Sequence, residues 1–163
     1  MENDTILKVY FAPQHFHHLI GLQKLKDINE VRKSQLNNTI RIFKNIMAQK
    51  ITIDNLKGSK YFHDIESRLK HFKQINTIVE FERIIIDFDS SLINTVITAD
   101  YILFKKSNDN MFLNLFLTSD AANNGFQIPR TFLPDPTDYY TYKQKELKIL
   151  SITKVPSRTK HRK

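Results

Sequence analysis

The chain has no cysteine and only 3 glycines among its 163 residues. Without cysteine there can be no disulfide, no thiolate metal site and no cysteine nucleophile, and this composition is typical of a reducing compartment. The scarcity of glycine argues against a loop that cradles nucleotide phosphates. The sequence also contains neither a Gly-x-Ser-x-Gly nor a His-Glu-x-x-His motif. We therefore expect no bound cofactor.

Long apolar runs are missing as well. No stretch approaches the roughly 18 consecutive apolar residues of a membrane span. The first residues, MENDTILKVYF, include acidic side chains and form no long apolar run before Pro13, unlike a signal peptide. We therefore expect a cytoplasmic protein with no membrane partner.

Negative charge is in the minority, because 25 lysines and arginines outnumber 17 acidic residues and leave a formal net charge of +8. Basic side chains that neutralise phosphates release counterions, so this balance favours a polyanionic partner such as RNA, with simple solubility as the alternative explanation. Several basic residues lie close to the C-terminus. We therefore expect one domain over residues 1–155 and a basic, disordered tail over residues 156–163.

The spacing of apolar residues predicts helices first and strands afterwards. Helical periodicity covers residues 14–28, 34–49 and 59–75, with Pro13 suited to a first turn and Ser34 to an N-cap. The β-prone segment ITIDNL should follow the second helix, and a small edge strand is expected near the N-terminus. That edge strand is residues 6–11, and the other strand-like segments are residues 79–88, 98–106, 111–118, 125–133 and 147–155.

Short, turn-rich connections join the later strands, and such connections favour hairpins. Helices grouped before strands predict an α+β fold. We expect the N-terminal helices to pack on one face of a C-terminal antiparallel sheet of about four to five strands.

A family resemblance begins in the predicted first helix, in the segment QHFHHLIGL at residues 14–22. Its order of aromatic residue, spacer, His18, leucine, spacer and Gly21 resembles the N-terminal motif of the phage-associated barnase, EndoU, colicin and RelE-like (BECR) nucleases, fourth phage subgroup. The likeness continues in order from about residue 6 to 154. The blocks that carry it are RIFKNI, KITI, SKYF, DYILFKK, FQIPRTF and LKILSI.

This resemblance implies a BECR-like fold and a metal-independent endoribonuclease that uses acid/base chemistry. It also implies a role as a toxin or in conflicts between phage and host. The partners it suggests are RNA, such as tRNA or mRNA, and an acidic antitoxin or immunity protein.

A ribonuclease without metal must take a proton from the 2′-hydroxyl, stabilise the phosphorane and protonate the leaving 5′-oxygen. Histidine suits the proton steps. His18, which the family motif marks, faces inward on a helical wheel, so a core histidine with a satisfied hydrogen bond is the alternative. His15 lies on the same flank as a second proton-transfer candidate or as a surface residue. His17 is predicted to be solvated, and these three histidines cannot converge on one metal ion.

The strands and loops supply the remaining candidates. Phosphate contacts and transition-state charge are assigned to Arg130, Lys105 and Ser151, with a solvated strand residue as the simpler reading of each. Strand alternation places Thr131 on the opposite face from Arg130. The predicted substrate-binding residues are Tyr101, Thr131, Tyr140 and Lys60.

The two tyrosines are suited to stacking on unpaired bases, although strand tyrosines often belong to the core. Arg130-Thr131 departs from the family pattern, which would have a small polar residue before the aromatic. The second hypothesis is therefore a catalytically inactive RNA- or protein-binding module with the same fold. A third is a structural or partner-binding phage protein.

Overall fold

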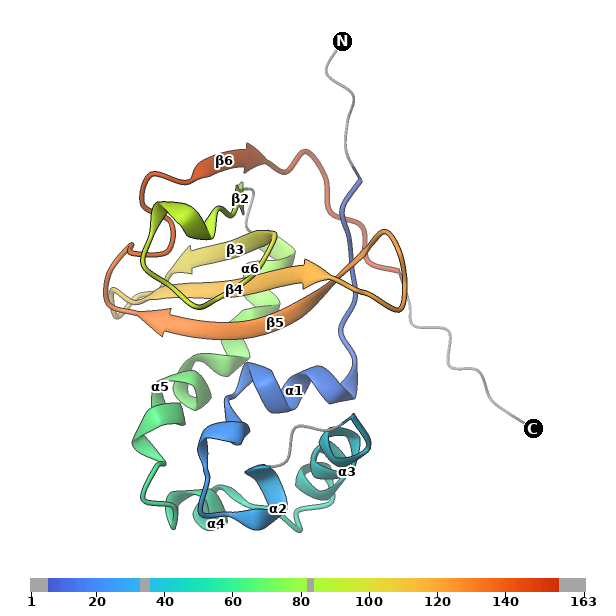
Figure 1. Ribbon diagram of the computed structural model, residues 1–163, viewed down its shortest axis with the longest axis vertical. Helices are drawn as coiled ribbons and strands as arrows, with labels where there is room; N and C mark the ends of the chain where they lie inside the picture. The colour runs from blue at the N-terminus through green and yellow to red at the C-terminus, as the bar shows by residue number, and fades with distance from the viewer. Residues whose placement is uncertain (1–5, 33–35, 82–83, 156–163) are drawn as a thin grey trace, which may run out of the picture.

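The computed structural model describes residues 6–32, 36–81 and 84–155, so the predicted tail at residues 156–163 and Ser34 lie outside it. The fold is α+β, as predicted. Figure 1 shows a curled sheet with most helices in a layer beside strand β5, while α6 crosses behind the sheet. No helix in these ranges is long and apolar enough to cross a membrane.

The elements follow one another along the chain as the sequence predicts, helices before most strands. The helices are α1 (Pro13–Leu19), η1 (Leu22–Lys24), α2 (Asn29–Arg32), α3 (Leu36–Met47), α4 (Ile53–Lys57), α5 (His63–His71), η2 (Phe72–Gln74), α6 (Ile75–Phe81) and η3 (Ser90–Leu92). The strands are β1 (Lys8–Val9), β2 (Ile84–Asp87), β3 (Tyr101–Lys106), β4 (Phe112–Ser119), β5 (Phe126–Asp135) and β6 (Lys145–Lys148).

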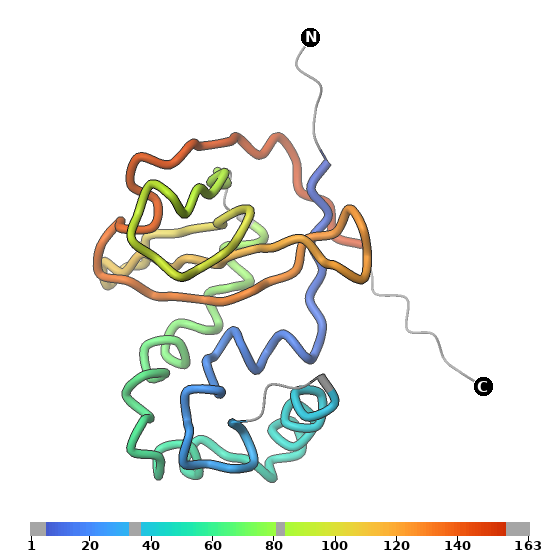
Figure 2. The backbone as a smooth tube through the Cα atoms, viewed as in Figure 1, coloured from blue at the N-terminus to red at the C-terminus, as the bar shows by residue number. Residues whose placement is uncertain are grey.

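The sheet has six strands in the order β1-β5-β4-β3-β2-β6, which corrects the expected four to five. Strands β2 to β6 are paired antiparallel, as predicted. The expected N-terminal edge strand exists, but it pairs parallel to β5. All helices and three other strands separate β1 from β5 in the sequence, so no tight turn forces an antiparallel pairing. Figure 2 traces how the two distant segments come side by side.

The predicted first helix is much shorter than its apolar periodicity suggests. Helix α1 ends at Leu19 because Gly21 adopts a left-handed conformation with φ of 79°, a common way to stop a helix. The β-prone segment after α3 instead forms α4, where Thr52 Oγ1 accepts from the Asn55 backbone N–H at 3.3 Å. Local capping therefore outweighs strand propensity there.

The predicted third helix is divided into α5 and η2, and α6 then extends helical structure to Phe81, beyond the expected start of strand structure. The first strand of the later group, β2, is correspondingly short.

Helices cover one face of the sheet and loops cover the other. The first core cluster joins α1 and α6 to the sheet through Leu19, Ile75, Ile78, Ile85, Leu103, Leu113, Leu115, Leu117 and Phe132. On the opposite face, the buried cluster of Ile86, Phe88, Ile102 and Phe116 packs against residues of the loops 88–99 and 136–144. A separate cluster lies within the helical layer. Burying each large apolar side chain contributes about 1.5–3 kcal/mol.

Strand β5 contains a bulge next to the helical layer. Phe116 of β4 pairs with Thr131, whereas Leu117 pairs with Pro129, so Arg130 is an extra residue in β5. A bulge disturbs side-chain alternation and re-aims the side chains beside it. The predicted placement of Arg130 and Thr131 on opposite faces therefore rests on a regular strand that is not present.

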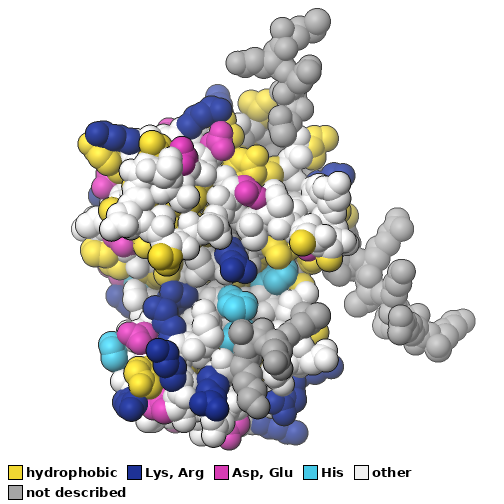
Figure 3. All heavy atoms as spheres, in the orientation of Figure 1, with side chains coloured by type: hydrophobic (Ala, Val, Ile, Leu, Met, Phe, Trp, Pro, Cys, Tyr) yellow, Lys and Arg dark blue, Asp and Glu magenta, His cyan; other side chains and the backbone are white. Residues whose placement is uncertain are grey.

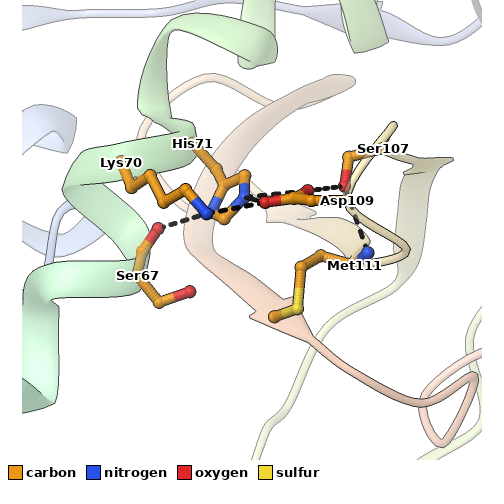
Figure 4. A network of polar contacts seen from close by, with 6 residues as sticks. All are labelled: Ser67, Lys70, His71, Ser107, Asp109 and Met111. Atoms are coloured by element: carbon orange, nitrogen blue, oxygen red, sulfur yellow. Dashed lines mark hydrogen bonds and ion pairs between the residues drawn. The ribbon is translucent and has the colours of Figure 1, made fainter.

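A polar network ties α5 to the turn between β3 and β4 (Figure 4). Asp109 Oδ2 lies 2.7 Å from Lys70 Nζ and 3.0 Å from His71 Nε2, and His71 Nδ1 donates to the Ser67 carbonyl oxygen at 2.8 Å. Ser107 Oγ donates to Asp109 Oδ1 at 2.5 Å. Hydrogen bonding from Lys70, then from Ser107 and His71, holds the pKa of Asp109 well below its ordinary range.

We expect Asp109→Asn to lower the free energy of unfolding near neutral pH. A carboxylate whose pKa is depressed by folding stabilises the protein above its unfolded pKa, and this stabilisation is lost as the pH falls toward the folded pKa. The stability curves of wild type and variant should therefore converge as the pH falls below about 4. Urea unfolding across this pH range measures the free energy of unfolding of each protein, and Asp54→Asn, at an exposed aspartate, is the control. Curves that stay parallel down to the lowest pH would contradict the expectation.

Candidate active site beside the β5 bulge

Helix α1 carries His18 and is fixed at both ends by its neighbouring histidines. The Ala12 backbone N–H donates to His15 Nδ1 at 3.1 Å, which ties the first turn of the helix. His17 Nε2 donates to the Val31 carbonyl oxygen of α2 at 2.5 Å. The His17 ring meets the His18 ring edge-on, with 5.2 Å between centroids. The position of His18 is therefore set by its contact with His17 and by the bonds that hold α1 to Ala12 and to α2.

His17 is fully buried, so the prediction that it is solvated was wrong. The physical reason is α2, a short helix that the sequence patterns did not predict and that covers this side of α1. The buried Nδ1 of His17 has no hydrogen-bond partner among the described residues.

His18 itself is half-buried. Its pKa is lowered chiefly by burial and further by the nearby charges of His17, Arg130 and His15. A histidine with a lowered pKa is neutral at neutral pH and can accept a proton. Helix α1 packs on β5, the strand whose bulge contains Arg130, and Leu19 and Phe132 share one core cluster.

Arg68 is the residue that joins this helix to the sheet. Its side chain is buried, and Nη1 donates to the His18 carbonyl oxygen at 3.4 Å and to Thr131 Oγ1 at 3.3 Å. A Cβ at Gly21 would stand 3.1 Å from the same nitrogen, so the glycine provides the room for the guanidinium. Sequence analysis missed Arg68. It nevertheless lies three residues after buried Ile65, on the apolar side of α5.

Arg68 has no carboxylate counterion among the ion pairs found in the described part of the chain. Burial lowers the pKa of Arg68, and the carboxylate that opposes this shift, Asp64, has its Oδ1 3.2 Å from His63 Nε2. Lys24 stands close enough for Arg68 to lower its pKa, after the larger effect of burial. A buried guanidinium without a paired carboxylate is suited to an anionic ligand, because its planar fork matches phosphate geometry.

Lys, Arg and His side chains gather on the face shown in Figure 3, where the sheet meets the helical layer and over that layer. Another predicted site residue is Tyr140, whose pKa is raised chiefly by burial and lowered in part by the charge of Arg68. Its ring contacts Phe116 edge-on at 5.2 Å between centroids, and Phe116 pairs with Thr131. The structure thus brings together four predicted residues and one that the sequence did not reveal: His18, Arg130, Thr131, Tyr140 and Arg68.

His15, a predicted proton-transfer residue, lies close enough to influence His18. It is buried rather than surface-exposed, and its Nδ1 is occupied by the Ala12 N–H. Burial lowers the pKa of His15, against an opposing effect of Asp120.

The remaining predicted residues lie elsewhere. Lys105 pairs with Leu113, and β4 separates its strand from β5. Ser151 follows β6, at the opposite edge of the sheet. Tyr101 is half-buried against the first core cluster, and Lys60 is exposed before α5 with Nζ 5.1 Å from the Tyr61 ring centroid. The roles assigned to these four residues stay predictions. The strand patterns do not reveal the order of strands in the sheet, which separates Lys105 and Ser151 from β5.

No group of three His, Cys, Asp or Glu side chains in residues 6–32, 36–81 and 84–155 could hold a metal ion. Among the known proteins compared with this chain, no curated protein and no solved structure matches it. A family described as phage-Barnase-EndoU-ColicinE5/D-RelE like nuclease 4 matches residues 2–161. The resemblance first seen around His18 therefore extends over nearly the whole chain, and the chain belongs to this phage-associated nuclease family.

Proposed function

We propose that the protein is a metal-independent endoribonuclease whose active site lies between α1, α5 and the bulge of β5. The observation that carries the proposal is the buried Arg68, which has no carboxylate partner among the described residues and bonds to both the His18 carbonyl and Thr131. Burying an uncompensated cation is costly, and a functional site that binds an anion is a physical reason to keep it.

In the proposed reaction, neutral His18 accepts the proton of the ribose 2′-hydroxyl as that oxygen attacks the adjacent phosphorus. Arg68 and Arg130 stabilise the charge that develops on the phosphorane. The bond from phosphorus to the 5′-oxygen breaks and that oxygen takes up a proton, which leaves a 2′,3′-cyclic phosphate and a 5′-hydroxyl. Positioned acid/base groups typically contribute about 10²–10⁴-fold to such a rate, and donors aimed at developing charge contribute a similar factor.

The distribution of charge supports a polyanionic substrate at this place. Residues 13–81 contain 12 lysines and arginines and 6 acidic residues, whereas residues 84–155 contain 7 lysines and arginines and 8 acidic residues. Between residues 13 and 155 the positive excess therefore belongs to the helical layer that adjoins the site, as the basic side chains in Figure 3 indicate, and four further basic residues are found in the sequence at residues 156–163. RNA phosphates flanking the cut bond would lie over this layer.

An inactive RNA-binding module of the same fold is the competing proposal. The exposed Arg130 in the bulge would serve binding as well as catalysis. The acidic antitoxin suggested by the family resemblance would approach the same basic surface, and it too stays a proposal.

We expect the protein to cut total RNA in EDTA and to leave 2′,3′-cyclic phosphate ends. The cut site would be mapped first, and an oligonucleotide with a single 2′-deoxy substitution at that site would serve as the matched control, because its nucleophile is missing. Sequencing of ends before and after treatment with a cyclic phosphatase measures the outcome. Activity lost in EDTA and restored by zinc or magnesium would overturn the mechanism, and RNA retained but intact would favour the binding module.

A further inference from the structure

Tyr140 differs from Tyr10 and from its neighbour Tyr139 in the hydrogen bonding of its hydroxyl. The Tyr10 hydroxyl donates to Asp120 Oδ2, and the Tyr139 hydroxyl donates to the Asn94 carbonyl oxygen, both at 2.7 Å. No hydrogen bond of the described residues uses the Tyr140 hydroxyl. That oxygen is also not among the buried atoms that lack a partner, so it is open to solvent. It is therefore available to a ligand.

The Tyr140 ring is nevertheless held firmly. It packs edge-on against Phe116 and against Tyr139, each with 5.2 Å between ring centroids. Phe116 lies directly opposite Thr131 on the adjacent strand, and Arg68 Nη1 reaches Thr131 Oγ1 at 3.3 Å. Tyr140 thus packs on the loop-covered face of the sheet at the level of Thr131, near enough to Arg68 for the two groups to influence one another electrostatically.

The proposed reaction also needs a general acid, and no residue has yet been assigned to that role. His18 can take the proton of the 2′-hydroxyl, but the leaving 5′-oxygen also needs a proton, and the alkoxide it would otherwise become is far more basic than a phenolate. Burial, then Asp135 and Tyr139, raise the pKa of Tyr140, so its phenol keeps its proton at neutral pH. The charge of Arg68 opposes this shift and would stabilise the phenolate once the proton has left.

We propose that Tyr140 is the general acid of this site and protonates the leaving 5′-oxygen. The inference rests on the proposed ribonuclease function. As the bond from phosphorus to the 5′-oxygen breaks, the Tyr140 O–H proton moves to that oxygen and a phenolate forms near Arg68. The phenolate then recovers a proton from water, while protonated His18 returns its proton to solvent. This role differs from base stacking, which would use the ring and not the hydroxyl.

The test changes the leaving group and the acid together. One oligonucleotide carries the bond that the wild-type protein cuts in total RNA, and a second has sulfur in place of the bridging 5′-oxygen at that bond. A thiolate leaves without a proton, so cleavage of the second oligonucleotide needs no general acid. Tyr140→Phe removes only the hydroxyl, and Tyr142→Phe is the matched control, because Tyr142 is exposed.

We expect Tyr140→Phe to cut the oxygen substrate about a hundredfold more slowly than wild type and the sulfur substrate at nearly the wild-type rate. Tyr142→Phe should cut both normally. A Tyr140→Phe protein that melts like wild type and slows both substrates equally, or neither, would overturn the acid role while leaving the ribonuclease function intact. A wild-type protein that cuts no RNA at all would instead overturn the function and this inference with it.

Discussion

Replacing His18 with glutamine should slow single-turnover RNA cleavage by about a hundredfold or more, while the protein stays folded and binds RNA. Glutamine keeps a hydrogen-bonding side chain but cannot accept a proton near neutral pH. In the wild-type protein, the activity should fall on the acid side as His18 becomes protonated. Burial and nearby cations lower the pKa of His18, so this fall should lie at a lower pH than for an ordinary histidine. The His18→Gln variant should not show this fall of activity at acid pH.

Three measurements separate the catalytic role of His18 from a structural one: a cleavage time course, a melting curve and an RNA-binding titration. A histidine that only satisfies the core would cost up to about 1–3 kcal/mol of stability on substitution, with little further change in activity. His63→Gln is the matched control, since His63 is largely exposed on α5. A folded His18→Gln protein that cuts at the wild-type rate would remove His18 from the mechanism.

Sequence patterns singled out His18 as a candidate because the family motif there is local and continuous. The α+β class was also predictable, since turn residues between apolar segments indicate hairpins irrespective of their arrangement in space. The extent of α1 was not, because helical spacing continues past Gly21, where the chain turns by adopting a positive φ. His17 was misplaced for a related reason: the partner that buries it, Val31, belongs to a one-turn helix too short to show periodicity.

The strand residues show a different limit. Alternation along one strand cannot reveal a bulge, which depends on how β5 pairs with β4, and the bulge decides where Arg130 and Thr131 lie. The order of strands in the sheet is equally non-local, and it separates Lys105 and Ser151 from the site around His18. Only three-dimensional pairing shows which of several polar strand residues come together.

Arg68 is a special case, because its position in the sequence suggests the opposite of its place in the structure. An arginine on the apolar side of a helix is expected to turn outward and leave its charge in water. Here it stays buried and reaches across to Thr131. Such conflicts between local pattern and structure concentrate at functional sites, where a group is retained at some cost to stability.

Arg68→Met should therefore abolish most cleavage without destabilising the fold. Methionine has a similar length and an apolar side chain, so it fills the space beside Gly21 and removes a buried charge that has no carboxylate partner among the described residues. We expect a melting temperature equal to or above that of wild type and a rate of cleavage lower by about 10²–10³-fold, as when one preorganised transition-state donor is lost. Melting curves and single-turnover cleavage measure the two effects.

Arg41→Met is the control for charge alone, since Arg41 is exposed on α3 and bonds only weakly to Asn38 at 3.4 Å. It should weaken RNA binding slightly and leave the rate of the chemical step unchanged. A purely structural Arg68 would give the reverse pattern: loss of its bonds to the His18 carbonyl and to Thr131 would lower stability, and activity would fall only in proportion to the unfolded fraction. Stability and activity that fall together would therefore reject Arg68 as the phosphate-binding residue. A variant that is more stable but inactive would show that the chain retains this buried charge for catalysis.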